Sequence, residues 1–156
     1  MRIVGGENRG LRLAEVGAGD PAAHLRPTAD RVREALSRGA AHCTFVDDAR
    51  AATRLIRDNI ARTRRAAQTT LLTCDARRLP PNPGPPATLV FLDPPYGRGL
   101  GAPALTAARA AGWIAPGALV VCEEAAPMAA PEGFTRLEDR RYGDTVLTLL
   151  ATDPPA

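Results

Sequence analysis

The chain of 156 residues contains no lysine, and all 20 of its basic side chains are arginines. The planar guanidinium of arginine suits contacts with phosphate groups, so a nucleic-acid partner is one interpretation of the net charge of +3. A compositional bias that replaces lysine by arginine everywhere is the other interpretation, and composition favours this bias. Aromatic residues are also few, at 4%, so Leu, Val, Ile and Ala must build most of the core.

The chain has two histidines and three cysteines, and Cys43, Cys74 and Cys122 form no Cys-x-x-Cys pair. We therefore expect no metal site, and we predict that the thiols are reduced and buried. No apolar run approaches the roughly 20 residues of a membrane-spanning helix. The apolar stretch at the N-terminus is too short for a secretory signal. We expect a cytoplasmic protein that does not associate with a membrane, and we expect a monomer.

The organisation predicted from the pattern is a single domain over residues 1–156. In residues 1–14 apolar and polar residues alternate loosely around two glycine turn signals, which predicts a β-hairpin. A linker rich in Gly, Ala, Asp and Pro follows to residue 25. Residues 26–156 would form the core of the domain, in which helices and strands alternate.

Helical patterns predict helices at residues 28–38, 49–63 and 100–111, and strands are predicted at residues 43–46, 69–73, 88–92, 118–122, 134–138 and 145–150. The continuous apolar runs at 88–92 and 118–122 predict strands that are buried on both faces. Apolar and polar residues alternate in the last two runs, which predicts a closing antiparallel pair of strands. Together these elements predict an α/β fold, an open sheet with helices on both faces.

The most informative stretch is Asp93-Pro94-Pro95-Tyr96, which follows the apolar run at residues 88–92. Ligands bind at the carboxyl ends of strands in open α/β sheets, so this is the predicted site. Two prolines remove two backbone donors, which leaves the Pro94 carbonyl able to point outward. The alternative interpretation is an ordinary turn at the end of a strand, and the full tetrapeptide favours function over that alternative.

These residues suit the activation of an exocyclic amino group on a nucleic-acid base. Such an amine is a poor nucleophile because its lone pair is delocalised into the ring. The Asp93 carboxylate and the Pro94 carbonyl can accept its two N–H groups, orient the nitrogen and stabilise the positive charge that develops on it. Tyr96 can stack on the base, which contributes about 1–3 kcal/mol.

The tetrapeptide resembles the (Asp/Asn)-Pro-Pro-(Tyr/Phe) motif of amino-methyltransferases. Segments along nearly the whole chain also resemble the 16S (small-subunit) rRNA guanine-N2 methyltransferases; they are residues 1–10, 25–40, 93–99 and 141–144. This resemblance implies a Rossmann-like class I methyltransferase fold with an N-terminal β-hairpin. It implies transfer of a methyl group from S-adenosyl-L-methionine to guanine N2, in free rRNA or in a partly assembled 30S subunit.

The resemblance also assigns further residues. Asp47, with Asp48 as a weaker candidate, would bind the ribose hydroxyls of the cofactor, and Asp75 and Ala76 would contact its adenine. The helix at residues 28–38 and the segment before it would hold rRNA through a set of four residues: Arg26, Thr28, Arg31 and Arg33.

The family pattern is interrupted after Leu36, which runs directly into Ser37. The family has a few tens of further residues at this point, including the first strand of the sheet and a Gly-rich loop around the methionine part of the cofactor. Without that strand, residues 43–46 must either pair directly with residues 88–92 or leave a gap.

Three functions therefore remain open for the sequence. The first is rRNA guanine-N2 methylation: the interruption is either an error in the assembled sequence of an active enzyme or a real shortening that leaves the chain inactive. The second is a non-catalytic RNA-binding remnant. The third is an adenine-N6 methyltransferase of DNA or RNA, because the tetrapeptide does not specify the base.

Overall fold

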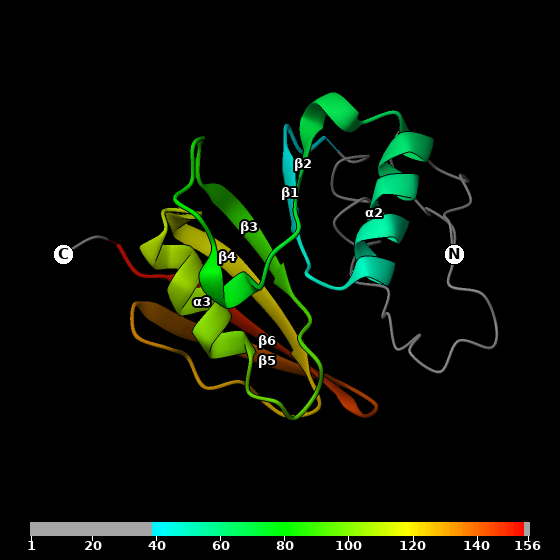
Figure 1. Cartoon of the computed structure of the whole chain (residues 1–156). Coiled ribbons are helices and arrows are strands. Elements are labelled where there is room, and N and C mark those ends of the chain that lie inside the picture. The colour runs from blue at the N-terminus through cyan, green and yellow to red at the C-terminus, as the bar shows by residue number, and fades with distance from the viewer. Residues whose placement is uncertain (1–38, 155–156) are drawn as a thin grey trace. The chain divides into compact units, whose positions relative to one another are not determined.

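A computed structural model of the chain describes residues 39–154 (Figure 1). The chain divides into two compact units, Met1–Asp75 and Ala76–Ala156, which we call the first and second units. The predicted hairpin, the linker and the helix at residues 28–38 lie outside the described residues. No described helix is long and apolar enough to cross a membrane.

The described part of the first unit is a strand–helix–strand motif. Strand β1 (Cys43–Val46) is followed by helix α2 (Arg50–Thr63), a short 3-10 turn and strand β2 (Thr69–Leu72). β1 and β2 pair in parallel, with Cys43 opposite Thr69. α2 buries Ala52, Ile56 and Asn59, spaced four and three residues apart on one face. Ile56 packs with Cys43 and Phe45 of β1, so the apolar face of the helix covers one side of this strand pair.

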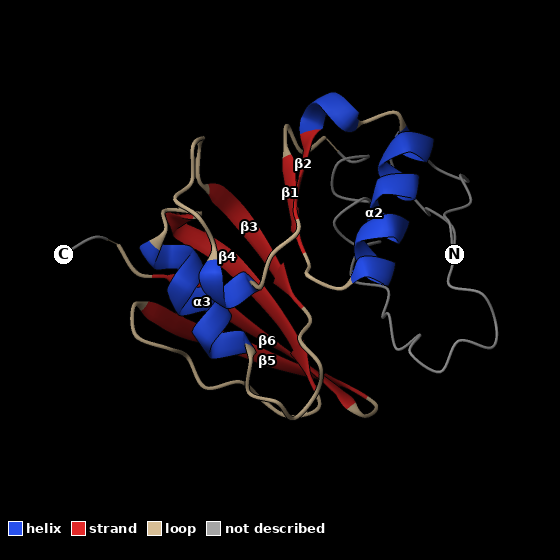
Figure 2. Cartoon of the chain, viewed as in Figure 1, coloured by secondary structure: helices blue, strands red, loops and turns tan. Residues whose placement is uncertain are grey.

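The second unit is a four-stranded mixed sheet (Figure 2). Its elements are a 3-10 turn η2 (Ala76–Arg78), β3 (Ala87–Leu92), α3 (Gly101–Ala110), β4 (Ile114–Glu124), β5 (Phe134–Tyr142) and β6 (Thr145–Thr152). The strand order is β3-β4-β6-β5, in which β3 and β4 are parallel and the other neighbours are antiparallel. The predicted closing antiparallel pair is therefore confirmed.

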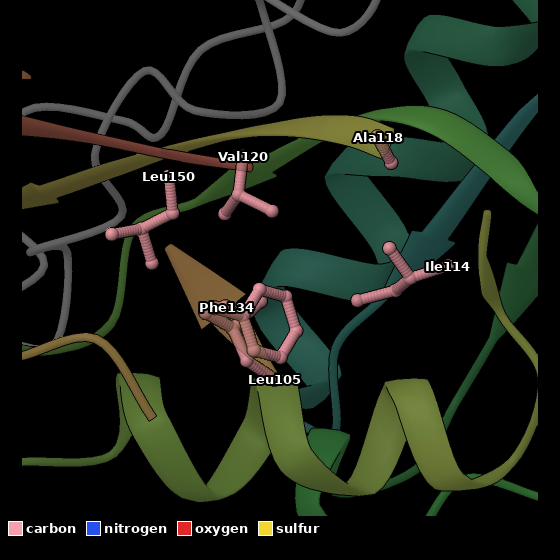
Figure 3. Packing of buried hydrophobic residues seen from close by; sticks show 6 residues of the cluster. All are labelled: Leu105, Ile114, Ala118, Val120, Phe134 and Leu150. Atoms are coloured by element: carbon pink, nitrogen blue, oxygen red, sulfur yellow. The ribbon is translucent and has the colours of Figure 1, made fainter. Parts of the chain in front are cut away.

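The core of the second unit lies between α3 and one face of its sheet (Figure 3). Leu105 of α3 is 1% exposed, while Val120 and Leu150 are fully buried on adjacent strands. Phe134 is the only aromatic residue in the buried set of this core, so branched aliphatic and alanine side chains fill most of it. This agrees with the low aromatic content of the chain.

The sheet predicted from the sequence is interrupted between its two halves. Among the described strands, β1 pairs only with β2, and β3 pairs only with β4. Residues 43–46 therefore do not pair with residues 88–92.

Three predictions about burial were wrong in detail. β3 is not buried on both faces, because it is an edge strand in the described sheet and residues 87–89 are exposed. β4 buries alternate residues only, since α3 covers one face, while Leu119 on the other face is 36% exposed. Cys43 and Cys122 are buried as predicted, but Cys74 is partly exposed. Strands β4, β5 and β6 also extend beyond their predicted bounds.

The core predicts a clear difference between two leucines. Leu105→Ala removes a fully buried side chain and should lower the free energy of unfolding by about 2–5 kcal/mol. Leu137→Ala is the matched control, because Leu137 is 57% exposed, and its effect should stay within about 0.5 kcal/mol. Urea titration measures both variants. Similar losses in the two variants would contradict the assignment of the core.

Candidate active site

The tetrapeptide lies directly after β3, at the carboxyl end of that strand. Asp93, Pro94 and Tyr96 are partly buried and Pro95 is exposed, and one carboxylate oxygen of Asp93 is itself buried. The Pro94 carbonyl accepts no backbone hydrogen bond from the part of the chain that the structure describes. The strand thus presents a carboxylate, a carbonyl oxygen and an aromatic ring at one end of the sheet.

Hydrogen bonds to two neighbouring strands hold the ring of Tyr96. Its hydroxyl donates to Oε1 of Glu123, at the carboxyl end of β4, over 3.3 Å. The same hydroxyl lies 3.2 Å from Oγ1 of Thr145, the first residue of β6. Because β3 and β4 are parallel and β6 runs the other way, these three strand ends meet at the same edge of the sheet.

A further hydrogen bond holds the loop after the tetrapeptide in place. The backbone N–H of Gly97 donates to Oε2 of Glu124 over 3.2 Å. Gly97 has a φ of +71° and Gly99 a φ of +61°, a region that glycine adopts without a steric penalty. The two glycines therefore allow the chain to turn sharply between Tyr96 and α3.

Sequence reasoning missed Glu123, Glu124 and Thr145. A signal for the two glutamates was present, because they directly follow the apolar run predicted as the strand at 118–122. Carboxylates at the end of a strand parallel to β3 must lie at the edge that carries Asp93. Nothing in the sequence indicated that Thr145 would reach Tyr96.

The edge concentrates negative charge. Burial raises the pKa of the Cys122 thiol to about 12, and the nearby carboxylates of Glu124, Asp93 and Glu123 contribute to that rise. Carboxylates that disfavour a thiolate also favour a nearby positive charge. The site is therefore electrostatically suited to a reaction in which a bound amine becomes cationic.

The candidate adenosine-binding residues of the first unit lie at the carboxyl ends of β1 and β2. Asp47 follows β1, and its N–H donates to the Leu72 carbonyl at the end of β2 over 3.1 Å. Its Oδ1 accepts the N–H of Ala49 over 2.9 Å, at the start of α2. Burial raises the pKa of Asp47, and the charge of Asp48 raises it too, while the bond from Ala49 acts in the opposite direction. Asp48 itself is exposed.

Asp75 follows β2 and is partly buried. It therefore shares with Asp47 the carboxyl edge of the β1–β2 pair. Ala76 begins η2, the first element of the second unit, which also contains Asp93 and Tyr96. The candidate residues thus fall into two groups, one in each unit.

The proposed RNA-binding residues Arg26, Thr28, Arg31 and Arg33 lie outside the described residues. Within residues 39–154 no group of three or more His, Cys, Asp or Glu side chains could hold a metal ion.

Comparison with known proteins gives three informative likenesses. Ribosomal RNA small subunit methyltransferase D of Escherichia coli (strain K12) is 30% identical over 151 residues, which cover 79% of this chain and 74% of the relative. The solved structure of the methyltransferase yhhF from Escherichia coli superposes with a TM-score of 0.78 at 27% identity, covering 99% of both chains. The N-methyltransferase NodS of Bradyrhizobium japonicum has a TM-score of 0.54 at 15% identity, over 81% of this chain and 80% of that one, and shows the fold alone.

The fold and these likenesses define the class of the protein: an α/β, Rossmann-like class I methyltransferase. The chain belongs to the family described as "Conserved hypothetical protein 95", which matches residues 33–151. The resemblance noted in the sequence is thereby confirmed at the level of the family.

The alignment with the Escherichia coli relative also bears on the interruption after Leu36. It extends over 151 positions but covers only 79% of this 156-residue chain. The alignment is thus longer than the part of this chain that it covers. The remaining positions must be residues of the relative that have no counterpart in this chain. A missing internal segment is consistent with the two separate sheets.

The raised pKa of Asp47 predicts a pH-dependent stability difference. Folding disfavours the ionised carboxylate, so ionisation of Asp47 lowers the free energy of unfolding. This loss is absent below the ordinary pKa of 3.8, develops as the pH rises above it, and is complete above the raised pKa of the folded state. Asp47→Asn keeps an oxygen acceptor for Ala49 but removes the charge. The variant should therefore equal the parent in free energy of unfolding at low pH and be slightly more stable than the parent at pH 7.

Urea titrations at several pH values test this expectation, with Asp58→Asn, an exposed carboxylate of α2, as the control for net charge. An Asp47→Asn variant that is less stable than the parent at pH 7 would show that the carboxylate is structural.

Proposed function

We propose that this chain carries the catalytic part of an S-adenosyl-L-methionine-dependent methyltransferase that acts on guanine N2 of 16S ribosomal RNA. The observation that carries the proposal is Asp93-Pro94-Pro95-Tyr96 at the carboxyl end of β3, with Tyr96 held by Glu123 and Thr145. The name of the Escherichia coli relative, a small-subunit ribosomal RNA methyltransferase, supports the choice of substrate.

In this proposal each residue of the tetrapeptide has a defined task. The Asp93 carboxylate and the Pro94 carbonyl accept the two N–H groups of the target amine and turn its nitrogen toward the methyl donor. Pro95 keeps the loop rigid because its φ is restricted. Tyr96 stacks on the target base, which must leave its own stack to reach the site. The carboxylates of the edge stabilise the positive charge that the amine gains.

The described residues fit one half of the cofactor. Asp47 and Asp75 lie at the carboxyl ends of adjacent parallel strands, where carboxylates can accept ribose hydroxyl and adenine amino donors. Asp48 and Ala76 are the neighbouring candidates. When bound, S-adenosyl-L-methionine supplies an electrophilic methyl group on its sulfonium.

The described residues do not fit the methionine half. That half requires a Gly-rich loop after a strand, where the backbone can approach the cofactor closely. Within residues 39–154 the Gly-rich turn that follows a strand is the one at 97–101, which belongs to the target-base loop. We therefore propose that the chain in its present form is inactive. The rRNA contacts proposed for Arg26, Thr28, Arg31 and Arg33 complete the assignment.

A non-catalytic RNA-binding protein is the second candidate, and the division of the described strands into two separate sheets favours it. An adenine-N6 methyltransferase is the third, because the tetrapeptide binds an amino group of either purine. Experiments on the present chain, and on a repaired chain with a strand and a Gly-rich loop inserted after Leu36, distinguish these candidates.

The first prediction concerns binding of the cofactor. The parent chain should bind S-adenosyl-L-methionine weakly or not at all, since only the adenosine end has partners. Insertion of a strand and a Gly-rich loop after Leu36, taken from the Escherichia coli relative, should restore binding. Calorimetry measures both proteins. Low-micromolar binding by the parent, or no gain on insertion, would contradict the placement of the gap.

The second prediction concerns the chemical step in the repaired chain. Asp93→Ala should abolish methyl transfer while leaving cofactor affinity nearly unchanged, because Asp93 contacts the amine and not the cofactor. Tyr96→Ala should also be severe, whereas Tyr96→Phe should be mild because the ring still stacks. Turnover by Asp93→Ala close to that of the unsubstituted enzyme would rule out the role assigned to this carboxylate.

A further inference from the structure

Two consecutive carboxylates end β4, and the proposed chemistry gives neither of them a hydrogen bond to the target base. Glu124 accepts the backbone N–H of Gly97 over 3.2 Å, while Glu123 accepts the hydroxyl of Tyr96 over 3.3 Å. Side chains alternate along a strand, so the two carboxylates leave opposite faces of the sheet. Glu123 is therefore the carboxylate of β4 that contacts the residue proposed to stack on the target base.

Strand register brings Glu123 beside Asp93. β3 and β4 are parallel and pair Leu92 with Cys122, so the next residues of the two segments follow side by side. Neighbouring strands lie about 4.8 Å apart. Burial raises the pKa of the Cys122 thiol, and the charges of Glu124 and of these two carboxylates raise it further, which places all three near one sulfur atom. Two hydrogen-bond acceptors thus stand next to each other at the edge where the amine is proposed to bind.

The two purines differ at the ring nitrogen beside their exocyclic amine. In guanine the N2 amine adjoins N1–H, which is a donor. In adenine the N6 amine adjoins N1 without a hydrogen, which is an acceptor. An ionised carboxylate accepts hydrogen bonds and donates none. A second carboxylate beside the one that binds the amine therefore complements guanine and repels adenine.

We propose that Glu123 selects guanine, because its carboxylate accepts N1–H of the target base while Asp93 and the Pro94 carbonyl accept the N2 amine. The hydrogen bond with the Tyr96 hydroxyl holds this carboxylate at the edge of the stacking ring. An ionised carboxylate has about four acceptor positions, so it accepts both the hydroxyl and N1–H. The inference rests on the proposed function, because it names the residue by which the same site distinguishes guanine from adenine.

The test uses the parent chain and single-stranded RNAs of about 8 nucleotides, which consist of uridine around one central purine. Guanine offers both the amine and N1–H. The base 2-aminopurine keeps the amine but has no hydrogen on N1, hypoxanthine keeps N1–H but has no amine, and adenine is the rival target. An RNA of uridine alone gives the background. Each RNA carries fluorescein at one end, and anisotropy titration gives its Kd.

The parent chain should bind the guanine RNA at least about fivefold more tightly than the 2-aminopurine and adenine RNAs. Glu123→Gln keeps an oxygen acceptor for the Tyr96 hydroxyl and adds an N–H donor. The variant should therefore bring the ratio of the Kd values for 2-aminopurine and guanine to about one.

Glu132→Gln is the matched control, because it removes the same charge from an exposed residue just before β5. β5 begins opposite the last residue of β6, so Glu132 lies near the other edge of the sheet. This variant should keep the parent ratio. Thermal unfolding of each variant verifies that it folds.

The outcomes separate the inference from the proposed function. Equal binding of guanine and 2-aminopurine by the parent, or an unchanged ratio in Glu123→Gln, would overturn selection by Glu123 and leave the proposed function in place. Equal binding of guanine and hypoxanthine would contradict the amine contacts of Asp93 and Pro94, which belong to the proposed function. If the parent binds the purine RNAs no more tightly than uridine alone, both fail.

Discussion

The parallel pairing of β3 with β4 is the interaction on which the candidate site depends. It places Leu92 opposite Cys122, so that Asp93, directly after β3, and Glu123, near the end of β4, lie at the same level of the sheet. The antiparallel pairing of β6 with β4 then brings Thr145 to this edge. Side chains from both of those strands hold the Tyr96 hydroxyl, so the position of this ring is a direct consequence of strand register.

The two sheets are separate in the described residues. We propose that the chain lacks a further strand, which would carry the loop for the methionine half of the cofactor. In the described residues β1 and β3 each have a strand partner on one side only. The candidate residues of each unit depend on a strand pairing within that unit, β1 with β2 in the first and β3 with β4 in the second.

Much of the fold and of the site could be predicted from the sequence. The strand patterns that end near Asp47, Asp75 and Asp93 located three strand ends, because a polar carboxylate is accommodated where a buried strand reaches the edge of its sheet. The interruption after Leu36 left open whether residues 43–46 pair with residues 88–92, and the structure shows that they do not. The contacts of Tyr96 were not predictable, as they depend on the register of β4 and β6. The exposure of β3 escaped prediction because an apolar run does not reveal whether a neighbouring strand is present.

The proposed function is tested most directly by identifying the atom that receives the methyl group. The measurement is mass spectrometry of nucleosides from small-subunit rRNA after incubation with labelled S-adenosyl-L-methionine and either the parent chain or the chain with the missing segment inserted. We predict labelled N2-methylguanosine with the repaired chain and no labelled nucleoside with the parent. Labelled N6-methyladenosine, or labelled product with the parent, would contradict the proposed function.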